Sequence, residues 1–232
     1  MSTLEVKRLN SLANINSSQN YLEVGVCTGE TFLQIDVPFK IGVDPNFVFS
    51  FKDYANEDTK FYEMSSDEFW SNPHNNKYKF DLIYLDGLHT FEQTFRDFCA
   101  SLKHSHDSTI WLLDDTCPIG WFAAHPDPVF VWKARKLLRI KETFWMGDVF
   151  KVFLAIHDFF PQFSYATFPK HGQTVVWKES RRNFNPTWNS LKIISKMGYH
   201  DFLMIKDSHL NVKDDELTIF NHLSNLERFH DK

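Results

Sequence analysis

Three things are missing from this sequence: a disulfide framework, a long apolar run and a surplus of basic charge. The three cysteines, Cys27, Cys99 and Cys117, are odd in number and lack C-x-x-C spacing. They therefore indicate neither a secreted disulfide scaffold nor a thiolate metal site. This cysteine usage favours a reducing compartment, and we expect a cytoplasmic location.

The N-terminus is polar, without the apolar core of a signal peptide, and no later stretch is apolar for long enough to span a bilayer. These absences predict a soluble protein with no membrane partner. Lysine and arginine number 25 against 30 aspartates and glutamates, for a formal charge of -5. That balance gives no reason to expect nucleic acid, so a small-molecule partner fits better, and a homo-oligomer is left open.

The first half of the chain alternates short apolar runs with polar or helical stretches, which is typical of a parallel sheet. Residues 79–87 and 108–115 are apolar until their acidic ends, as expected of central strands covered on both faces. Between them, Thr90 is a predicted helix cap. The helix that follows has an apolar stripe formed by Phe91, Phe95, Phe98 and Leu102.

The second half predicts helices at residues 130–140 and 148–160, followed by a hairpin of residues 163–168 and 173–178. This hairpin would give the sheet an antiparallel edge. The character of the sequence changes near residue 180. The tail predicts one helix from Pro186 to about Met197 and a second built on Leu217, Phe220, Leu223 and Leu226.

A glycine loop follows the first predicted strand, with the pattern Glu23-x-Gly25-x-x-x-Gly29. Glycines at this place let backbone N–H groups approach a ligand closely. The spacing differs from the dinucleotide fingerprint and from the P-loop. Asp44 ends the second run, at about the separation at which a carboxylate receives ribose hydroxyls. Each signal alone also fits a simple turn.

Two acidic clusters, Asp86-Gly87-Leu88-His89 and Asp114-Asp115, follow the central strands. Because parallel strands end at one edge of a sheet, these side chains should converge there. Adjacent residues of a strand point to opposite faces, so Asp114 and Asp115 can share an ion only if the strand has already ended. The alternative is structural: a turn, a helix neighbour of His89 and a solvated strand end.

The segments YLEVGVCTGE, IGVDP and FDLIYLDGLHTFEQTFRDF resemble class I S-adenosylmethionine-dependent methyltransferases. They are most similar to the group with the macrocin and mycinamicin sugar O-methyltransferases and the cephalosporin-biosynthesis relatives. The resemblance covers roughly residues 20–180. It implies an α/β, Rossmann-like doubly wound sheet, mostly parallel, in a methyltransferase domain of residues 1–180. Residues 181–232 would be a helical C-terminal extension packed on that domain.

The resemblance also implies site residues. Glu23, Gly25 and Gly29 would surround the methionine part of S-adenosylmethionine, and Asp44 would bind its ribose. One or more of the residues after the third strand would neighbour the adenine, and these are Ser65, Ser66 and Asp67.

A divalent metal, probably magnesium in this group, would be bound by Asp86, Asp114 and Asp115, with His89 as the general base. The chemistry fits these residue types. A hydroxyl must lose its proton as it attacks the sulfonium methyl, a bound metal lowers the pKa of that hydroxyl, and a neutral histidine can accept the proton. Carboxylate ligands without cysteine favour Mg²⁺ over Zn²⁺.

The sequence thus predicts metal-assisted methyl transfer from S-adenosylmethionine to a hydroxyl of a small molecule, with a sugar or glycoconjugate as the acceptor. Two alternatives remain: a non-catalytic binding or scaffold protein, and another nucleotide-cofactor or metal-dependent enzyme on a similar sheet. In the loop WFAAHPDP, His125 is a secondary candidate for a base or substrate contact, and Trp121 and Phe122 either stack on an acceptor or pack the loop.

Overall fold

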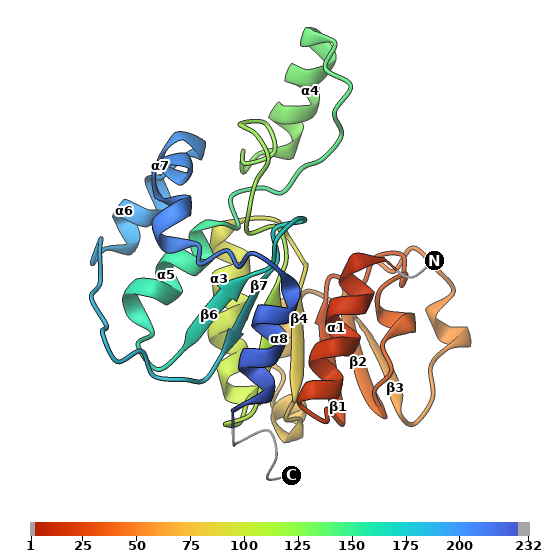
Figure 1. The fold of residues 1–232 in the computed structure, drawn as a ribbon. Coiled ribbons are helices and arrows are strands. Elements are labelled where there is room, and N and C mark those ends of the chain that lie inside the picture. The colour runs from red at the N-terminus through yellow and green to blue at the C-terminus, as the bar shows by residue number, and fades with distance from the viewer. Residues whose placement is uncertain (1–2, 227–232) are drawn as a thin grey trace.

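The computed structural model describes residues 3–226 and contains a seven-stranded sheet with helices on both faces (Figure 1). The strands are β1 (Asn20–Val24), β2 (Phe39–Asp44), β3 (Thr59–Glu63), β4 (Leu82–Leu85), β5 (Ile110–Leu113), β6 (Ser164–Thr167) and β7 (Thr174–Trp177). Their order is β3-β2-β1-β4-β5-β7-β6. Only β7 runs antiparallel to its neighbours, β5 and β6. This confirms the predicted mostly parallel, doubly wound sheet with an antiparallel closing hairpin.

The helices form two layers. α1 and α8 pack on one face of the sheet, and α2, α3 and α5 pack on the other. Within residues 3–226 no helix is both long and apolar enough to cross a membrane. The α-helices are α1 (Leu4–Ile15), α2 (Ser66–Ser71), α3 (Phe91–Ser101), α4 (Pro128–Leu138), α5 (Lys151–Phe159), α6 (Leu191–Lys196), α7 (Tyr199–His209) and α8 (Glu216–Ser224). Short 3-10 turns are η1 (Phe32–Gln34), η2 (Phe51–Asp53), η3 (Pro73–Lys77) and η4 (Leu102–His104).

Side chains of the central strands alternate between these two layers. Leu22 and Val24 of β1 join the core against α3 and α5, whereas Tyr21 joins the core under α1. By the same alternation Glu23 points to the side of α1. Every residue of β4 and β5 is buried, which confirms the predicted central strands.

The strand order reverses beside β1. The chain moves outward from β1 to β2 and β3 and then returns to place β4 on the other side of β1. The connection from β1 to β2 contains only the 3-10 turn η1. Doubly wound sheets bind ligands in the crevice above such a switch point. The loops after β1, β2 and β4 therefore define where to look for the site.

Local capping explains where several helices begin and end. α3 starts as predicted, because the Thr90 hydroxyl accepts a hydrogen bond from the Gln93 amide at 3.4 Å. The helix predicted from Pro186 is shorter and is represented by α6. The amides of residues 187–189 instead donate to the buried Asp158 carboxylate at 2.7–2.8 Å, which holds them outside a helix. Helices α1 and α7 were not predicted.

Arg8 of α1 is a buried cation that joins the two ends of the chain. Its Nε and Nη2 donate to Glu216 of α8 at 2.9 and 2.6 Å, and its Nη1 donates to Gln173 at 3.0 Å. Nη2 also donates to the Pro169 carbonyl at 2.7 Å, and the guanidinium lies 4.7 Å from the centre of the Phe168 ring. These contacts pack the C-terminal extension against α1 and the hairpin.

Residues 118–147, called the arm from here on, lie between β5 and α5 and carry α4. Figure 1 shows α4 standing away from the sheet at the end of two connecting segments. A hydrogen bond of 2.9 Å from the Met146 amide to the Ala123 carbonyl joins the two ends of the arm at its base. Val131 and Arg135 of α4 are buried. The arm therefore has a small packed interior of its own.

Candidate functional site

A cavity of about 470 Å³ lies above the switch point, at the ends of β1, β2 and β4 and the start of α2. Its volume lies in the range of ordinary cofactor sites. Many residues singled out from the sequence border it, although they are far apart in the chain. They are Gly25, Asp44, Ser65, Ser66, Asp67, Asp86 and His89.

Gly25 sits where the loops after β1 and β4 cross. Its φ is +93°, and a Cβ built on it would lie 1.9 Å from the Asp86 carbonyl oxygen. No side chain fits there without moving backbone. Gly29 also has a positive φ, +78°, but its would-be Cβ meets the Phe49 ring at 2.7 Å. Gly29 lies outside the lining of the cavity, so it shapes the loop rather than bordering the ligand space.

Asp44 fastens the glycine loop to the end of β2. Its Oδ2 accepts a hydrogen bond from the Cys27 amide at 2.8 Å, and its Oδ1 accepts one from the Asn46 amide at 2.8 Å. The residue is 8% exposed and borders the cavity. Each carboxylate oxygen can accept a second hydrogen bond, so a ligand hydroxyl can still bind here.

Ser65, Ser66 and Asp67 form the wall opposite the glycine loop. Ser65 caps α2 in a reciprocal arrangement with Glu68. Gln93 of α3 closes this wall, donating from Nε2 to Ser66 Oγ at 3.1 Å and to Asp67 Oδ1 at 3.3 Å. Gln93 borders the cavity. Sequence reasoning treated it only as part of a helix start, because nothing local indicates its reach across to α2.

Glu23 is not brought to the cavity. It is 1% exposed, it accepts a hydrogen bond from the Tyr21 hydroxyl at 2.6 Å, and it lies on the α1 side of β1. Burial raises its pKa from 4.5 to about 8. The period-2 alternation of β1 places Glu23 and Val24 on opposite faces, and Val24 is the one that borders the cavity.

Asp86, His89 and Asp115 form a compact group at the rim of the cavity. One ligand atom of each lies within 4.8 Å of the others. His89 Nδ1 is hydrogen-bonded to Asp115 Oδ2. Asp115 follows the end of β5 with a φ of +58°, and this left-handed turn swings its carboxylate toward His89. Two carboxylates and one imidazole in this space are a donor set that fits a divalent cation.

The electrostatics of this group reflect crowded acids. Burial raises the pKa of Asp86 well above its usual value, and the nearby charges of Asp114 and Asp115 raise it further. Burial alone would lower the pKa of His89, but the hydrogen bond and charge of Asp115 outweigh it, so the net shift is upward. A cation would relieve the repulsion among these carboxylates.

Asp114 points the other way. Its Oδ2 accepts hydrogen bonds from the Tyr84 hydroxyl and, at 3.2 Å, from Gln173 Nε2, both on the α1 side of the sheet. Burial, followed by the charge of Asp115, raises its pKa. Asp86 and Asp114 still border a common small cavity of about 10 Å³, the room of one water at most. The structure thus separates the predicted pair: Asp115 joins the group at the rim, and Asp114 supports it from below.

The base of the arm lies against His89. The Trp145 and His89 rings have centroids 5.2 Å apart, and Trp145 Nε1 donates to the His125 carbonyl at 2.7 Å. A Cβ on Gly147 would lie 1.6 Å from the His89 carbonyl oxygen, so the two backbones touch. His125 itself packs beside Phe130 in the arm and does not border the cavity.

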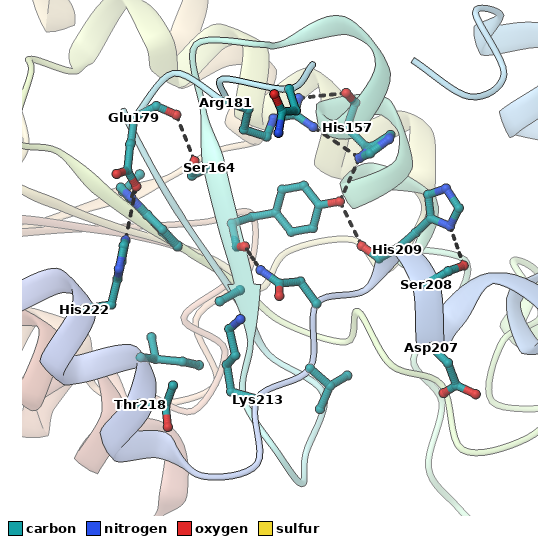
Figure 2. Close-up of a pocket in the computed structure, with 17 residues that line it drawn as sticks. His157, Ser164, Glu179, Arg181, Asp207, Ser208, His209, Lys213, Thr218 and His222 are labelled. Carbon is teal, nitrogen blue, oxygen red and sulfur yellow. Dashed lines mark hydrogen bonds and ion pairs between the residues drawn. The ribbon is translucent and has the colours of Figure 1, made fainter. Parts of the chain in front are cut away.

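A second cavity, of about 590 Å³, runs along the edge strand β6 (Figure 2). It shares no lining residue with the first. Its polar groups join the C-terminal extension to the sheet: the Tyr165 hydroxyl donates to the His209 carbonyl at 2.8 Å, and His222 pairs with Glu179 at 3.1 Å. Arg181, expected to be a solvated surface residue, donates to three carbonyls at the end of α5.

Comparison with known proteins agrees with this geometry. Residues 40–116 match a family described as a methyltransferase domain, whereas no curated protein matches the chain. The O-methyltransferase from Bacillus cereus in complex with SAH is 18% identical, with a TM-score of 0.52 over 77% of this chain and 82% of that one. The SAH-bound methyltransferase from Podospora anserina is 15% identical, with a TM-score of 0.55 over 78% and 80%.

A third solved structure is the O-methyltransferase of tomaymycin synthesis from Streptomyces achromogenes, in complex with SAM. It is 14% identical, with a TM-score of 0.50 over 78% of this chain and 82% of that one. The chain therefore has the Rossmann-like fold of S-adenosylmethionine-dependent methyltransferases.

Proposed function

We propose that this protein transfers a methyl group from S-adenosylmethionine to a hydroxyl of a small molecule, and that the acceptor is a sugar or glycoconjugate. The observation that carries the proposal is the cavity at the switch point, with the Asp86, His89 and Asp115 group at its rim. A cofactor space beside a candidate acid–base and metal group is what hydroxyl methylation needs. The methyltransferase fold supports the choice of the cofactor.

In this proposal the cofactor lies between the glycine loop and the start of α2. Gly25 leaves the room for the methionine part, Asp44 accepts the ribose hydroxyls, and Ser65, Ser66 and Asp67 border the adenine. Glu23 and Gly29 act at a distance. Glu23 holds the end of β1 through Tyr21, and Gly29 holds the loop through Phe49.

At the rim, His89 is the general base. Its Nδ1 bonds to Asp115, which fixes the ring and leaves Nε2 to take the proton of the acceptor hydroxyl. Asp86 and Asp115 would hold a divalent cation, probably Mg²⁺, with Asp114 supporting them from the α1 side. Such an ion, when bound, lowers the pKa of the hydroxyl and orients it. Trp145 shields this place from water on the arm side.

The test separates cofactor binding from turnover. S-adenosylhomocysteine should raise the melting temperature of the protein, whereas NAD should not, because only a true ligand stabilises the folded state by mass action. Stabilisation by NAD alone would refute the proposal. With radiolabelled S-adenosylmethionine and a panel of sugars, His89→Ala should lower transfer by about 10²-fold or more while keeping S-adenosylhomocysteine binding. His200→Ala, on the surface of α7, is the matched control.

The metal is tested on the protein without turnover. After treatment with EDTA, titration with Mn²⁺ should give a saturable change in Trp145 fluorescence or an enhanced water-proton relaxation. Asp115→Ala should weaken this binding by about 10–100-fold. Equal binding by the wild type and the variant would remove Asp115 from the proposed ligands.

A further inference from the structure

An aromatic path leads from the reaction centre onto the arm. The Trp145 ring lies 5.2 Å from that of His89, and the Trp132 ring of α4 lies 6.5 Å from that of Trp145. Trp132 is 57% exposed although it is among the largest apolar side chains of the protein. Exposed aromatic rings in a row beside a cavity mark a binding surface rather than a folding core. Their flat apolar faces suit ring-shaped ligands that keep polar edges in water.

The same arm concentrates positive charge in an otherwise acidic chain. Residues 127–145 carry five basic side chains against two acidic ones, whereas the chain as a whole has 25 against 30. Lys133 and Lys136 of α4, with Lys141 beyond it, are exposed. Within residues 3–226 the structure gives these three side chains no hydrogen bond or ion pair. They are available to an anionic ligand.

Arg135 adds an independent indication of an anion. It is 4% exposed, yet its Nε and Nη1 are buried and have no hydrogen-bond partner within the described part of the chain. Its Nη2 donates to the Phe144 carbonyl at 2.6 Å, and the nearest carboxylate, that of Glu142, is 3.9 Å away. A buried guanidinium with idle donors is costly unless an acceptor comes to it.

We propose that the arm is the acceptor-binding element and that the acceptor is an acidic saccharide, one carrying carboxylate or phosphate groups. Its rings stack on Trp145 and Trp132, its charged groups meet Lys133 and Lys136, and one hydroxyl reaches His89. The inference rests on the proposed function and names the acceptor class of that same site. The path begins at His89, which favours a ligand that enters the reaction centre over a lipid surface or a second copy of the chain, either of which would cover only the outside of α4.

The experiment measures binding by the full chain, saturated with S-adenosylhomocysteine. The probes are hexamers of galacturonate and of hyaluronan, both acidic, and maltohexaose, which is neutral. At least one acidic hexamer should quench the tryptophan fluorescence saturably at low salt and bind at least fivefold more tightly than maltohexaose. Binding should weaken as NaCl is raised, because the charges lie on the surface.

The variants assign the binding to the arm. Trp132→Ala and the double variant Lys133→Gln, Lys136→Gln should each weaken acidic-hexamer binding by at least fivefold. The matched controls, Met204→Ala and Lys192→Gln, change equally exposed side chains on α7 and α6 and should have no effect. The melting temperature should be unchanged in all of them, since these side chains lie outside the core.

Three outcomes overturn the inference: neither acidic hexamer binds, the arm variants bind as well as the wild type, or α4 engages only anionic vesicles or a second copy of the chain. Its failure is distinguishable from that of the proposed function. If S-adenosylhomocysteine stabilises the wild type while no acidic hexamer binds, only the acceptor assignment is wrong. If S-adenosylhomocysteine does not stabilise it, the proposed function itself is refuted.

Discussion

Replacing Gly25 by alanine tests whether the crossing of two loops builds the cofactor cavity. The new Cβ would lie 1.9 Å from the Asp86 carbonyl oxygen. Ordinary contact needs about 3.5 Å, so the backbone after β4 must retreat by about 1.5 Å. The φ of +93° adds strain of its own, about 1–2 kcal/mol for a residue with a Cβ. With about 1–3 kcal/mol for overpacking, the free energy of unfolding should fall by about 3 kcal/mol.

For a chain of this length, such a loss lowers the melting temperature by roughly 6–12 °C. Circular dichroism melts would measure it, and calorimetric titration with S-adenosylhomocysteine should show affinity reduced at least tenfold. Gly120→Ala is the control, because a Cβ there has nothing within 4 Å, and it should melt within about 1 °C of the wild type. A Gly25→Ala protein with wild-type melting and cofactor affinity would refute the reasoning.

Three further predictions concern stability, each measured by urea unfolding. The His171 hydrogen bond, 2.7 Å long, lowers the pKa of Glu5 from 4.5 to about 2. Glu5→Gln should therefore cost about 1 kcal/mol near pH 6, allowing for solvent screening, and the cost should vanish as pH falls from 4.5 to 2 and as it rises through the raised pKa of His171. Arg8→Met should cost about 3–5 kcal/mol, because its buried partners lose their donor. Asp158→Ala should cost about 2–4 kcal/mol and speed hydrogen exchange of the amides of residues 187–189.

Surface pairs provide the contrast for these predictions. Arg96 and Asp67 form an ion pair of 2.6 Å, but both side chains are about half exposed, so Arg96→Met should change stability by no more than about 0.5 kcal/mol. A loss as large as that of Arg8→Met would show that burial does not set the cost. A pH-independent effect of Glu5→Gln would mean that its ion pair with His171 is not formed in solution.

The fold was predictable from the sequence wherever the signal was local. The apolar runs of β4 and β5, the Thr90 cap and the hairpin around Gly172 each carry their own instruction in a few residues. Helix α1 was missed because Arg8 interrupts its apolar stripe, and that arginine is buried only through partners about 160 or more residues away. Helix α7 buries only Phe202, so its sequence shows no stripe at all.

The site was predictable in its place but not in its orientation. Strand ends gave the neighbourhood of Asp44, Asp86 and Asp115. Whether Asp114 or Asp115 faces His89 depends on a left-handed turn at Asp115 and on Tyr84 and Gln173, which capture Asp114 from below. No pattern within the cluster encodes those contacts. The metal requirement and the cofactor contacts stay predictions.

The short hydrogen-bonded base of the arm gives the protein a detachable part. Because Met146 and Ala123 already meet, the chain between them is a loop whose closure does not involve the sheet. Doubling its length would cost only about 0.6 kcal/mol of loop entropy. Residues 124–145 could thus be exchanged as a cassette while the cofactor cavity keeps its shape. In such chimeras, acceptor choice would be inherited with the cassette and chemistry with the scaffold.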